Sequence, residues 1–544
     1  MIFNQRSGYL NFGSTLILGL LALAACGGSR PPNTSARITL YLATEPPSLN
    51  TVISEDNTSY QILDHITEGL LGFDRDGRLI PAVAVRWEFD PASGGTFHLR
   101  ENARWSDGSP VTAQDFVFAW RLAVDPSVGS GYAYIMYPVR HAEAINRGQL
   151  PLESLGVSAP EAHTLVVQLE RPTPYFLSLT AFSVYRPIKE TFYRRLGARY
   201  GADADALLYN GPYLIRRWIH GADLELETNP WYWQRSALRI EAISYPYFTS
   251  DPATMLNLFR DGKVAMADLS NESIDIALAE HYDIRVKEPG VLNYLGLNQR
   301  QGRPTHSLAL RRALQAVIDP AELANRVIGR PDVEPGVSLY PRWIRRRALD
   351  DAAPFAPHKP DARTLKDLMA LARTEWPGSA GTSLTLLTPD DGSNGRVAEY
   401  LQRVFAERLG VRLRIDRQTF KQVLARQEAA DFDLVFASWA PDFDDPLAYA
   451  NILVTQYADG SRVYQNAEMD RALAVAQTSI DPAQRQAAFV ALDRIANDQV
   501  LLIPILESGG GQYSLYVQDP RLEGVRRSKI AGDPNFNSAW LSAQ

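Results

Sequence analysis

Residues 432–453 read FDLVFASWAPDFDDPLAYANIL, and this stretch decides how the chain folds. Its first part, residues 434–437, is apolar throughout and predicts a buried strand that ends near Trp439. Two prolines then enclose an acidic and aromatic turn at residues 442–445. Such a turn is either a solvated surface loop or a ligand site, and the stretch alone leaves both readings open.

Two strand–helix pairs precede this stretch. Residues 383–388 alternate as a strand, and residues 393–409 carry apolar side chains at helical spacing before a glycine. Residues 411–415 alternate again, and a second helix begins near Phe420. The resulting β-α-β-α-β order predicts an α/β fold with a mostly parallel sheet. Because ligands of open α/β sheets bind beyond the carboxyl ends of the strands, residues 439–446 are a candidate site.

Length and composition exclude several classes of protein. A chain of 544 residues is too long for one core and, at roughly 100–200 residues per domain, predicts about two to four domains. The formal net charge is -7, which argues against a nucleic-acid partner. No repeated period indicates a solenoid or a propeller.

The amino terminus has the pattern of an export signal. Residues 16–25 form an apolar run that is too short to span a bilayer, which predicts a signal peptide at residues 1–25. The run ends in Leu-Ala-Ala-Cys at Cys26, the only cysteine, and resembles a bacterial lipobox. We expect a lipid on Cys26 and a tether at residues 26–36; the alternative is an ordinary signal peptide with an incidental cysteine.

Dense motifs in the first third of the chain resemble those of one transport family. They are TEPPSLN at 44–50, HITEGLLGFDRDG at 65–77, TFHLRENARWSDGSPVTAQDFVFAWR at 96–121 and NGPY at 210–213. These segments are similar to the extracytoplasmic oligopeptide-binding proteins of ABC import systems, solute-binding protein family 5. The likeness extends from about residue 37 to the carboxyl terminus.

The resemblance implies a two-lobed, three-domain fold of the periplasmic-binding-protein type, with a hinged cleft between the lobes. Residues 37–67, 201–297 and 506–544 would form a discontinuous lobe 1. Residues 68–200 would be a second domain inserted into it, and residues 298–505 would form lobe 2. The expected protein is a monomer in the periplasm or cell envelope, without a cofactor, that captures oligopeptides for an ABC permease pair and meets the membrane only through its lipid.

The resemblance also assigns ligand-binding residues. Asp442 matches the carboxylate that holds the ammonium group of the ligand, and a turn-capping aspartate is the alternative. Ser438 and Ala440, which flank Trp439, match positions where the backbone of the family pairs with the ligand like an added strand. Tyr132 matches an aromatic residue of the inserted domain that reaches the ligand, and Glu55 and Asn57 match positions of lobe 1 that face it. Phe420 matches a residue that lines a side-chain pocket. Several of these side chains could equally belong to the core or to the surface.

Some positions depart from the family pattern. Phe436 stands where peptide-specific relatives have an arginine for the ligand carboxylate. At two further positions where those relatives have basic residues, this chain has Gln427 and Glu428. Residues 504–507 replace a tyrosine-rich segment. The ligand could therefore be a long or blocked peptide, a cell-wall peptide, an opine, a sugar or a metal chelate.

The sequence contains no constellation that indicates catalysis. The eight histidines are scattered, and neither a GxSxG elbow nor a phosphate-binding loop is present. A secreted hydrolase would need two opposed carboxylates about 5–9.5 Å apart, which adjacent acids such as Asp442, Asp444 and Asp445 do not provide. The same turn lacks the spacing of an EF-hand, so we expect no metal site.

Overall fold

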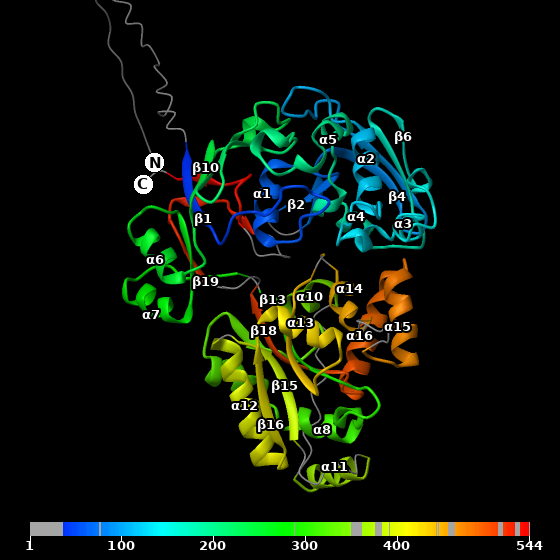
Figure 1. Ribbon diagram of the computed structural model, residues 1–544, viewed down its shortest axis with the longest axis vertical. Helices are drawn as coiled ribbons and strands as arrows, with labels where there is room; N and C mark the ends of the chain where they lie inside the picture. Colours follow the sequence, from blue (N-terminus) through cyan, green and yellow to red (C-terminus); the bar gives the residue numbers. More distant parts are fainter. Residues whose placement is uncertain are drawn as a thin grey trace, which may run out of the picture. The chain divides into compact units, whose positions relative to one another are not determined.

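Several separate β-sheets with helices packed on them make up the structure, a computed structural model (Figure 1). It describes residues 36–74, 78–287, 289–349, 362–375, 383–390, 392–441, 443, 445–454, 463–509, 515–527 and 534–542. Ala36–Gln544 forms one compact unit. The signal peptide, Cys26 and the tether up to residue 35 lie outside the described residues. Within those ranges no helix is long and apolar enough to cross a membrane.

One four-stranded sheet joins the first strand to segments far along the chain. Its order is β1 (Arg37–Leu42), β10 (Ala242–Phe248), β9 (Asp223–Thr228) and β8 (Tyr213–Ile219). Helix α1 (Asn57–Ile66) begins where Asp56 accepts a hydrogen bond from the Ser59 amide at 2.9 Å. Near its other end the buried His65 Nε2 lies 3.1 Å from the Phe536 amide, which ties the carboxyl-terminal segment to this sheet region.

A second sheet combines the middle of the chain with its end. Strand β19 (Leu515–Gln518) lies between β11 (Met266–Leu269) and β12 (Arg285–Val286), and both pairings are antiparallel. Helices α6 (Pro252–Arg260) and α7 (Asn271–Ala279) pack beside it. Both sheets therefore join segments that the family resemblance groups as lobe 1.

The segment expected to be the inserted domain, residues 68–200, has a sheet of its own. Its strand order is β4 (Ala84–Asp90), β5 (Gly94–Leu99), β7 (Thr164–Gln168) and β6 (Val157–Glu161). Helix α2 (Ala113–Val124) begins with a capping box between Thr112 and Asp115, in which Asp115 Oδ2 accepts from the Thr112 amide at 2.8 Å. The small hairpin β2 (Leu71–Phe73) and β3 (Leu79–Pro81) and helices α3 (Ala142–Asn146), α4 (Phe176–Leu179) and α5 (Glu190–Leu196) complete this segment.

Residues 434–439 form a strand of a six-stranded mixed sheet. Its order is β14 (Val333–Pro335), β18 (Leu502–Gly509), β13 (Pro289–Leu297), β17 (Leu434–Trp439), β15 (Ser383–Pro389) and β16 (Arg412–Gln418). The expected β-α-β-α-β order is confirmed, with α12 (Gly392–Leu409) and α13 (Phe420–Glu428) as the helices. Strand β15 is parallel to both β16 and β17, but the pairings that add β13, β18 and β14 are antiparallel. The expectation of a mostly parallel sheet is therefore wrong, because strands from outside the β-α-β-α-β segment join it in the antiparallel direction.

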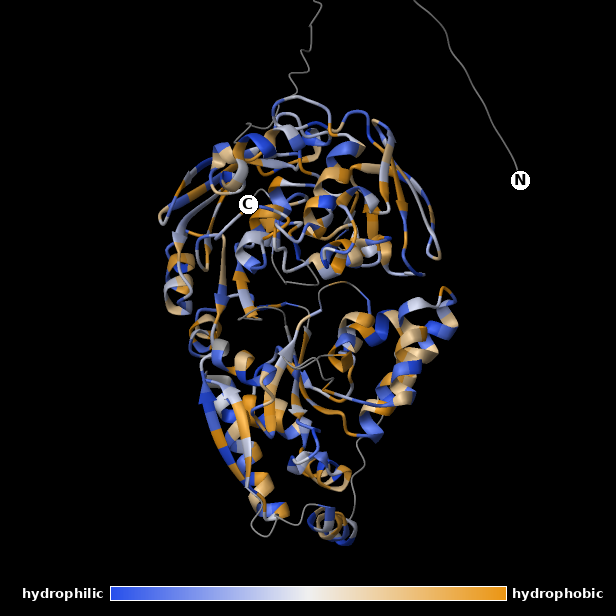
Figure 2. Cartoon of the chain, turned by 45° about the vertical axis from the view of Figure 1, so that its right-hand side comes forward, coloured by the Kyte–Doolittle hydropathy of each residue, from blue (hydrophilic) through white to orange (hydrophobic). Residues whose placement is uncertain are grey.

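Apolar side chains fill both faces of this sheet. Leu434 and Phe436 belong to a core with α12 and α8 (Leu308–Val317), and Val435 packs with Val423 of α13 on the other face. Figure 2 shows hydrophobic residues along the inner strands of this sheet and mixed colouring along the helices and the outer strand. A strand buried on both faces explains why residues 434–437 are apolar without alternation.

The other elements are short or surround lobe 2. They are α9 (Pro320–Glu322), α10 (Arg342–Ala348), α11 (Ala362–Glu375), α14 (Leu447–Ala450), α15 (Ala467–Thr478), α16 (Pro482–Asp498), β20 (Leu522–Glu523), β21 (Arg526–Arg527), β22 (Pro534–Asn535) and β23 (Trp540–Leu541). Two boundaries differ from the expectation. Strand β13 precedes residue 298 and yet pairs along its length with β17 and β18, and β18 continues past residue 505 to Gly509 in the same sheet. Both strands therefore belong to the sheet of lobe 2.

Candidate functional site

The carboxyl-terminal half of β17 has a strand neighbour on one side only. Strand β13 pairs with β17 from Leu434 to Trp439, whereas β15 is in register only with Leu434 and Val435. Among the described residues no strand pairs with the β15 side of residues 436–440, and Ser438 and Ala440 are exposed. This free edge can accept the backbone of an extended ligand.

Another edge of the same sheet is less suited to a ligand. The outer strand β16 carries charged side chains at Arg412, Arg414, Asp416 and Arg417, which is how natural sheets protect an edge from strand addition. Residues 436–440 carry no charge. The contrast makes the edge of β17 the candidate for ligand pairing.

A row of polar side chains crosses the sheet next to this edge. Ser438 Oγ donates a hydrogen bond to Asn293 Oδ1 at 2.7 Å, and Asn293 Nδ2 donates to Ser508 Oγ at 3.1 Å. The three residues come from β17, β13 and β18. Sequence reasoning named Ser438 but missed Asn293 and Ser508, although Asn293 stands out as a polar residue in the apolar run LNYLGL.

Trp439 has a structural role besides its place on the edge. Its side chain is half-buried against the core, and its Nε1 donates a hydrogen bond to the Ala448 carbonyl at 2.8 Å. The indole thus ties the end of β17 to helix α14. Its backbone, rather than its ring nitrogen, is what remains for a ligand.

The acidic turn after β17 is fixed by one of its own acids. Asp445 is 8% exposed and forms a two-pronged ion pair with Arg485 of α16, at 2.6 and 2.7 Å. Asp445 Oδ1 also accepts from the Leu447 amide at 2.9 Å. Asp445 therefore holds the turn. Asp442 and Asp444 lie outside the described residues, so the assignment of Asp442 remains a prediction.

Phe443 extends from the same turn toward the inserted segment. Its ring stacks on Tyr175, with centroids 5.2 Å apart and 14° between the ring planes. The Arg485 guanidinium lies 5.6 Å from the centroid of the Tyr175 ring. Sequence reasoning did not identify Tyr175 or Arg485, because their partners lie far away in the chain.

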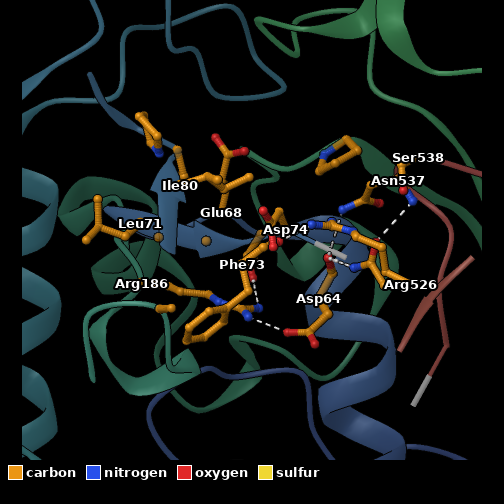
Figure 3. A pocket seen from close by; sticks show the side chains of 18 of the residues that line it. Asp64, Glu68, Leu71, Phe73, Asp74, Ile80, Arg186, Arg526, Asn537 and Ser538 are labelled. Atoms are coloured by element: carbon orange, nitrogen blue, oxygen red, sulfur yellow. Dashed lines mark hydrogen bonds and ion pairs between the residues drawn. The ribbon is translucent and has the colours of Figure 1, made fainter. Parts of the chain in front are cut away.

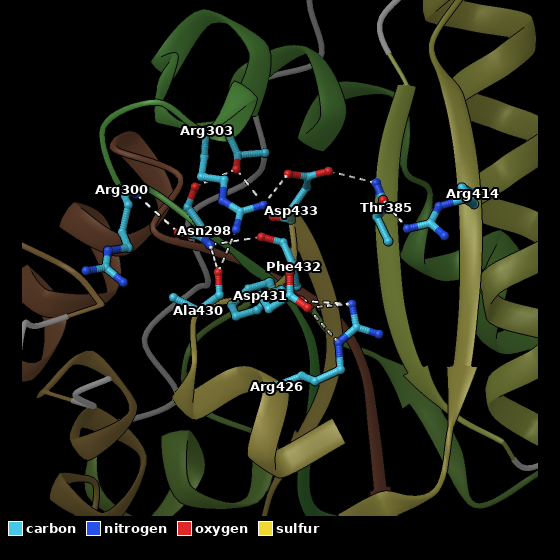
Figure 4. A network of polar contacts seen from close by, with 11 residues as sticks. Asn298, Arg300, Arg303, Thr385, Arg414, Arg426, Ala430, Asp431, Phe432 and Asp433 are labelled. Atoms are coloured by element: carbon cyan, nitrogen blue, oxygen red, sulfur yellow. Dashed lines mark hydrogen bonds and ion pairs between the residues drawn. The ribbon is translucent and has the colours of Figure 1, made fainter. Parts of the chain in front are cut away.

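A polar network fixes the opposite end of β17 (Figure 4). Asp433 Oδ2 accepts from the Thr385 amide at 2.9 Å, and Asp433 Oδ1 lies 3.4 Å from Arg303 Nη1. Asn298 Nδ2 donates to the carbonyls of Ala430 and Phe432 at 3.0 and 2.8 Å. With both ends fixed, β17 presents its free edge on a rigid support.

The candidate residues of the first lobe come together in part. Tyr132 is half-buried and contacts Tyr60 and Phe182 edge to face, with centroids 6.2 and 5.3 Å away. A Cβ added at Gly131 would lie 1.8 Å from Glu55 Oε1, so the Glu55 carboxylate reaches the loop that carries Tyr132. Asn57 is exposed at the first position of α1.

The positions that depart from the family pattern have different environments. Phe436 is 3% exposed and packs in the core of lobe 2, so its side chain does not face a ligand on the sheet edge. Gln427 is half-buried and Glu428 exposed, both on α13. Phe420 is the first residue of α13, and its side chain lies outside what the structure describes.

Glu507, in the segment that replaces the tyrosines, is a buried acid. It is 1% exposed, its Oε2 accepts from the Arg342 amide at 2.7 Å, and burial raises its pKa to about 7. Its cross-strand neighbour on β14 is a second acid, Glu334. No cluster of His, Cys, Asp and Glu in the described ranges could hold a metal ion.

A cavity of about 360 Å³ opens on the lobe 1 side (Figure 3). It is lined by residues of α1 and the β2–β3 hairpin, by residues between 178 and 186, and by Arg526, Arg527, Asn535, Asn537 and Ser538 of the carboxyl-terminal segment. Tyr60 and Phe182, which contact Tyr132, are in its wall, and so is Phe443. The cavity therefore adjoins both the Tyr132 group and the acidic turn.

Comparisons with known proteins agree on one family. Residues 78–461 match the model of the bacterial extracellular solute-binding proteins, family 5. The chain is 27% identical over 461 residues to the periplasmic oligopeptide-binding protein OppA of Salmonella typhimurium, covering 83% of each chain. It is 28% identical to the probable deoxycholate-binding periplasmic protein YgiS of Escherichia coli, covering 85% of this chain and 86% of YgiS.

A solved structure shows the same fold. The substrate-binding domain of an oligopeptide ABC transporter from Bacillus anthracis superposes with a TM-score of 0.73 and 29% identity, covering 93% of this chain and 99% of that one. The relatives are binding proteins rather than enzymes. The family match spans more than half of the chain, and the protein belongs to family 5 of the bacterial extracellular solute-binding proteins.

Proposed function

We propose that this protein captures oligopeptides in an extended conformation and delivers them to the permease pair of an ABC importer. The observation that carries the proposal is the free edge of β17 at residues 436–440, next to the row formed by Ser438, Asn293 and Ser508. Backbone pairing along a strand binds peptides of different sequence, because it uses groups that every residue has.

The amino end of the peptide would be held by Asp442. A carboxylate beside an ammonium group forms a charge-assisted hydrogen bond worth about 1.5–3 kcal/mol. The neighbouring Asp445–Arg485 pair supports this role, because it fixes the turn without using Asp442. Tyr132, Glu55, Asn57 and Phe420 would contribute surrounding contacts, which need not select one side chain.

The carboxyl end of the peptide would be held differently from that in peptide-specific relatives. Phe436 packs in the core, and α13 offers Gln427 and Glu428 in place of basic groups. Without a basic group at positions 427, 428 and 436, the site favours long peptides whose carboxyl end projects beyond β17. A free carboxylate next to Glu428 would be repelled rather than bound.

The place of action follows from the proposed anchor. A diacylglycerol on Cys26 would hold the binding domain at the outer face of a membrane, and the several relatives named periplasmic support an extracytoplasmic place. Binding between two lobes would select a closed state that the permease pair recognises. The protein would act as a monomer, without nucleic acid or cofactor.

A second candidate keeps the fold and replaces the peptide with another solute. The burial of Phe436 and the exposed Glu428 favour it, and one relative is named for deoxycholate binding. Native mass spectrometry of the full-length protein, released from detergent, separates the two. A distribution of peptide masses is expected on the protein; one non-peptide mass would contradict the oligopeptide proposal.

A further inference from the structure

The cavity on the lobe 1 side combines apolar walls with isolated charges. Its apolar lining includes Leu71, Phe73, Ile80, Phe182, Trp233 and Phe443. Its volume of about 360 Å³ is in the range of small-molecule pockets, which is roughly 300–1,000 Å³. Figure 3 shows charged side chains from α1, from residue 186 and from the carboxyl-terminal segment around this space.

Two of the charges on the wall neutralise each other. Arg186 forms an ion pair with Asp64, and its Nη1 donates to Thr67 Oγ1 at 2.9 Å. The Arg186 side chain is 8% exposed, so this pair is part of the wall. The other charged residues that line the cavity are Glu68, Asp74, Arg526 and Arg527.

Glu68 is held by neutral groups. Its two carboxylate oxygens accept from Tyr232 Oη and Trp233 Nε1, both at 2.7 Å. The nearby Arg100 guanidinium lies over the Trp233 ring, 3.5 Å from its centroid, and donates to the Ala82 carbonyl. Burial raises the pKa of Glu68, although part of its surface remains accessible on the cavity side.

Arg526 is the counterpart of Glu68 with the opposite charge. Within the described residues its terminal nitrogens donate to two neutral oxygens, the Phe73 carbonyl and Asn535 Oδ1, the latter at 3.0 Å. Its Nε is buried without a hydrogen-bond partner in the same ranges, and burial lowers the pKa of the guanidinium. A guanidinium has five N–H donors, so Arg526 retains donors for an anion.

We propose that this cavity binds a small zwitterion of amino-acid or dipeptide size, with its ammonium group at Glu68 and its carboxylate at Arg526. Glu68 and Arg526 are each held in place by hydrogen bonds to neutral partners, and a buried charge gains most from a directly opposed charge. The apolar walls fit an aliphatic side chain. The site does not use the edge of β17, so it extends the proposed function rather than depending on it.

The first test uses purified full-length protein and four probes in isothermal titration calorimetry. L-leucine and L-leucyl-L-leucine carry both charges, leucinamide lacks the carboxylate, and N-acetyl-leucine lacks the ammonium group. At least one zwitterion should bind, and each half-charged analogue should bind at least about ten-fold more weakly than leucine. Absence of binding by both zwitterions, or equal binding of the analogues, would overturn the inference.

The second test uses variants. Arg526→Gln should weaken zwitterion binding by at least about ten-fold, whereas Arg521→Gln should leave it unchanged, because Arg521 is exposed and pairs with Asp519. Equal affinity of the two variants would refute the role of Arg526. Should Arg526→Gln fail to fold, the analogue series on the wild-type protein still decides the question.

The two proposals fail separately. A protein that carries oligopeptides by native mass spectrometry but binds neither leucine nor leucyl-leucine would overturn only the zwitterion site. One that binds a zwitterion but carries no oligopeptide would overturn only the proposed function.

Discussion

Phe443 stacks on Tyr175 with ring centroids 5.2 Å apart and an angle of 14° between the ring planes. The two rings come from segments that the family resemblance groups as lobe 2 and as the inserted domain. The turn that carries Phe443 also contains Asp445, which is paired with Arg485, and Arg485 lies over the Tyr175 ring. This group of side chains connects the proposed ligand turn to the rest of the protein.

The stacked pair should contribute a measurable coupling energy. In a double-mutant cycle of Phe443→Ala and Tyr175→Ala, we expect a coupling of about 0.5–1.5 kcal/mol in the free energy of unfolding. Tyr175→Phe keeps the ring and should behave like the wild type. Strict additivity of the two alanine substitutions would show that the rings do not interact in solution.

Breaking the Asp445–Arg485 pair should destabilise the protein strongly. Both side chains are buried, and removing one partner leaves an uncompensated charge, so Arg485→Met should lower the free energy of unfolding by about 3–5 kcal/mol in urea titrations. Arg494→Met, on the same helix as Arg485, is the matched control, because the ion pairs of Arg494 with Glu468 and Asp498 are exposed and their loss should cost about 1 kcal/mol or less. Equal effects would contradict the structural role of Asp445.

Asp442 should behave in the opposite way to Asp445. Asp442→Ala should remove the rise in melting temperature that oligopeptides produce, while the melting temperature without peptide stays at the wild-type value. Affinity should fall by about ten-fold or more, as expected for a lost charge-assisted bond. Asp442→Asn keeps the size and should show a similar loss; unchanged peptide stabilisation in both variants would remove Asp442 from the site.

Glu507 should make the stability depend on pH. Because its pKa in the folded protein is raised from 4.5 to about 7, the folded state binds a proton that the unfolded chain has lost between these values. This stabilisation is complete below about pH 4.5 and is lost as the pH rises through about 7. Glu507→Gln should therefore gain stability relative to the wild type between about pH 5 and pH 8 in urea titrations.

The control for this experiment is Glu523→Gln, which changes an exposed glutamate. The difference between its free energy of unfolding and that of the wild type should be the same at about pH 5 and about pH 8. A Glu507→Gln variant with the same behaviour would show that the buried carboxyl does not titrate as proposed.

Cys26→Ser should release the protein from membranes and abolish its labelling by fatty acids. Cys26 is the only cysteine, so no other thiol can carry the lipid. Membrane fractionation after metabolic labelling with an alkyne fatty acid measures both effects. Labelling that persists in the variant would refute the lipobox assignment.

The sequence predicted the sheet around β17 because its signals are local. Apolar runs, alternation and a glycine at the end of α12 are enough to place β15, α12, β16, α13 and β17 in order. The addition of β13 to that sheet could not be predicted in the same way, because strand pairing over long sequence separations leaves no periodic signal.

The candidate site was predictable to a smaller extent. Resemblance pointed to residues 438–440, and the free edge explains why backbone groups there are available. Resemblance could not show that Phe436 packs in the core or that Asp445 is paired with Arg485, because both facts depend on neighbours brought together by folding. Glu68 and Arg526 are far apart in the sequence, and resemblance could not show that folding brings both to the wall of one cavity.

The most direct test of the central claim is amide hydrogen exchange with and without a bound oligopeptide. If an extended peptide pairs with β17, exchange should slow at residues 436–440, while the outer edge of β16 should be unaffected. Peptide binding shown by calorimetry without slower exchange at residues 436–440 would contradict the account.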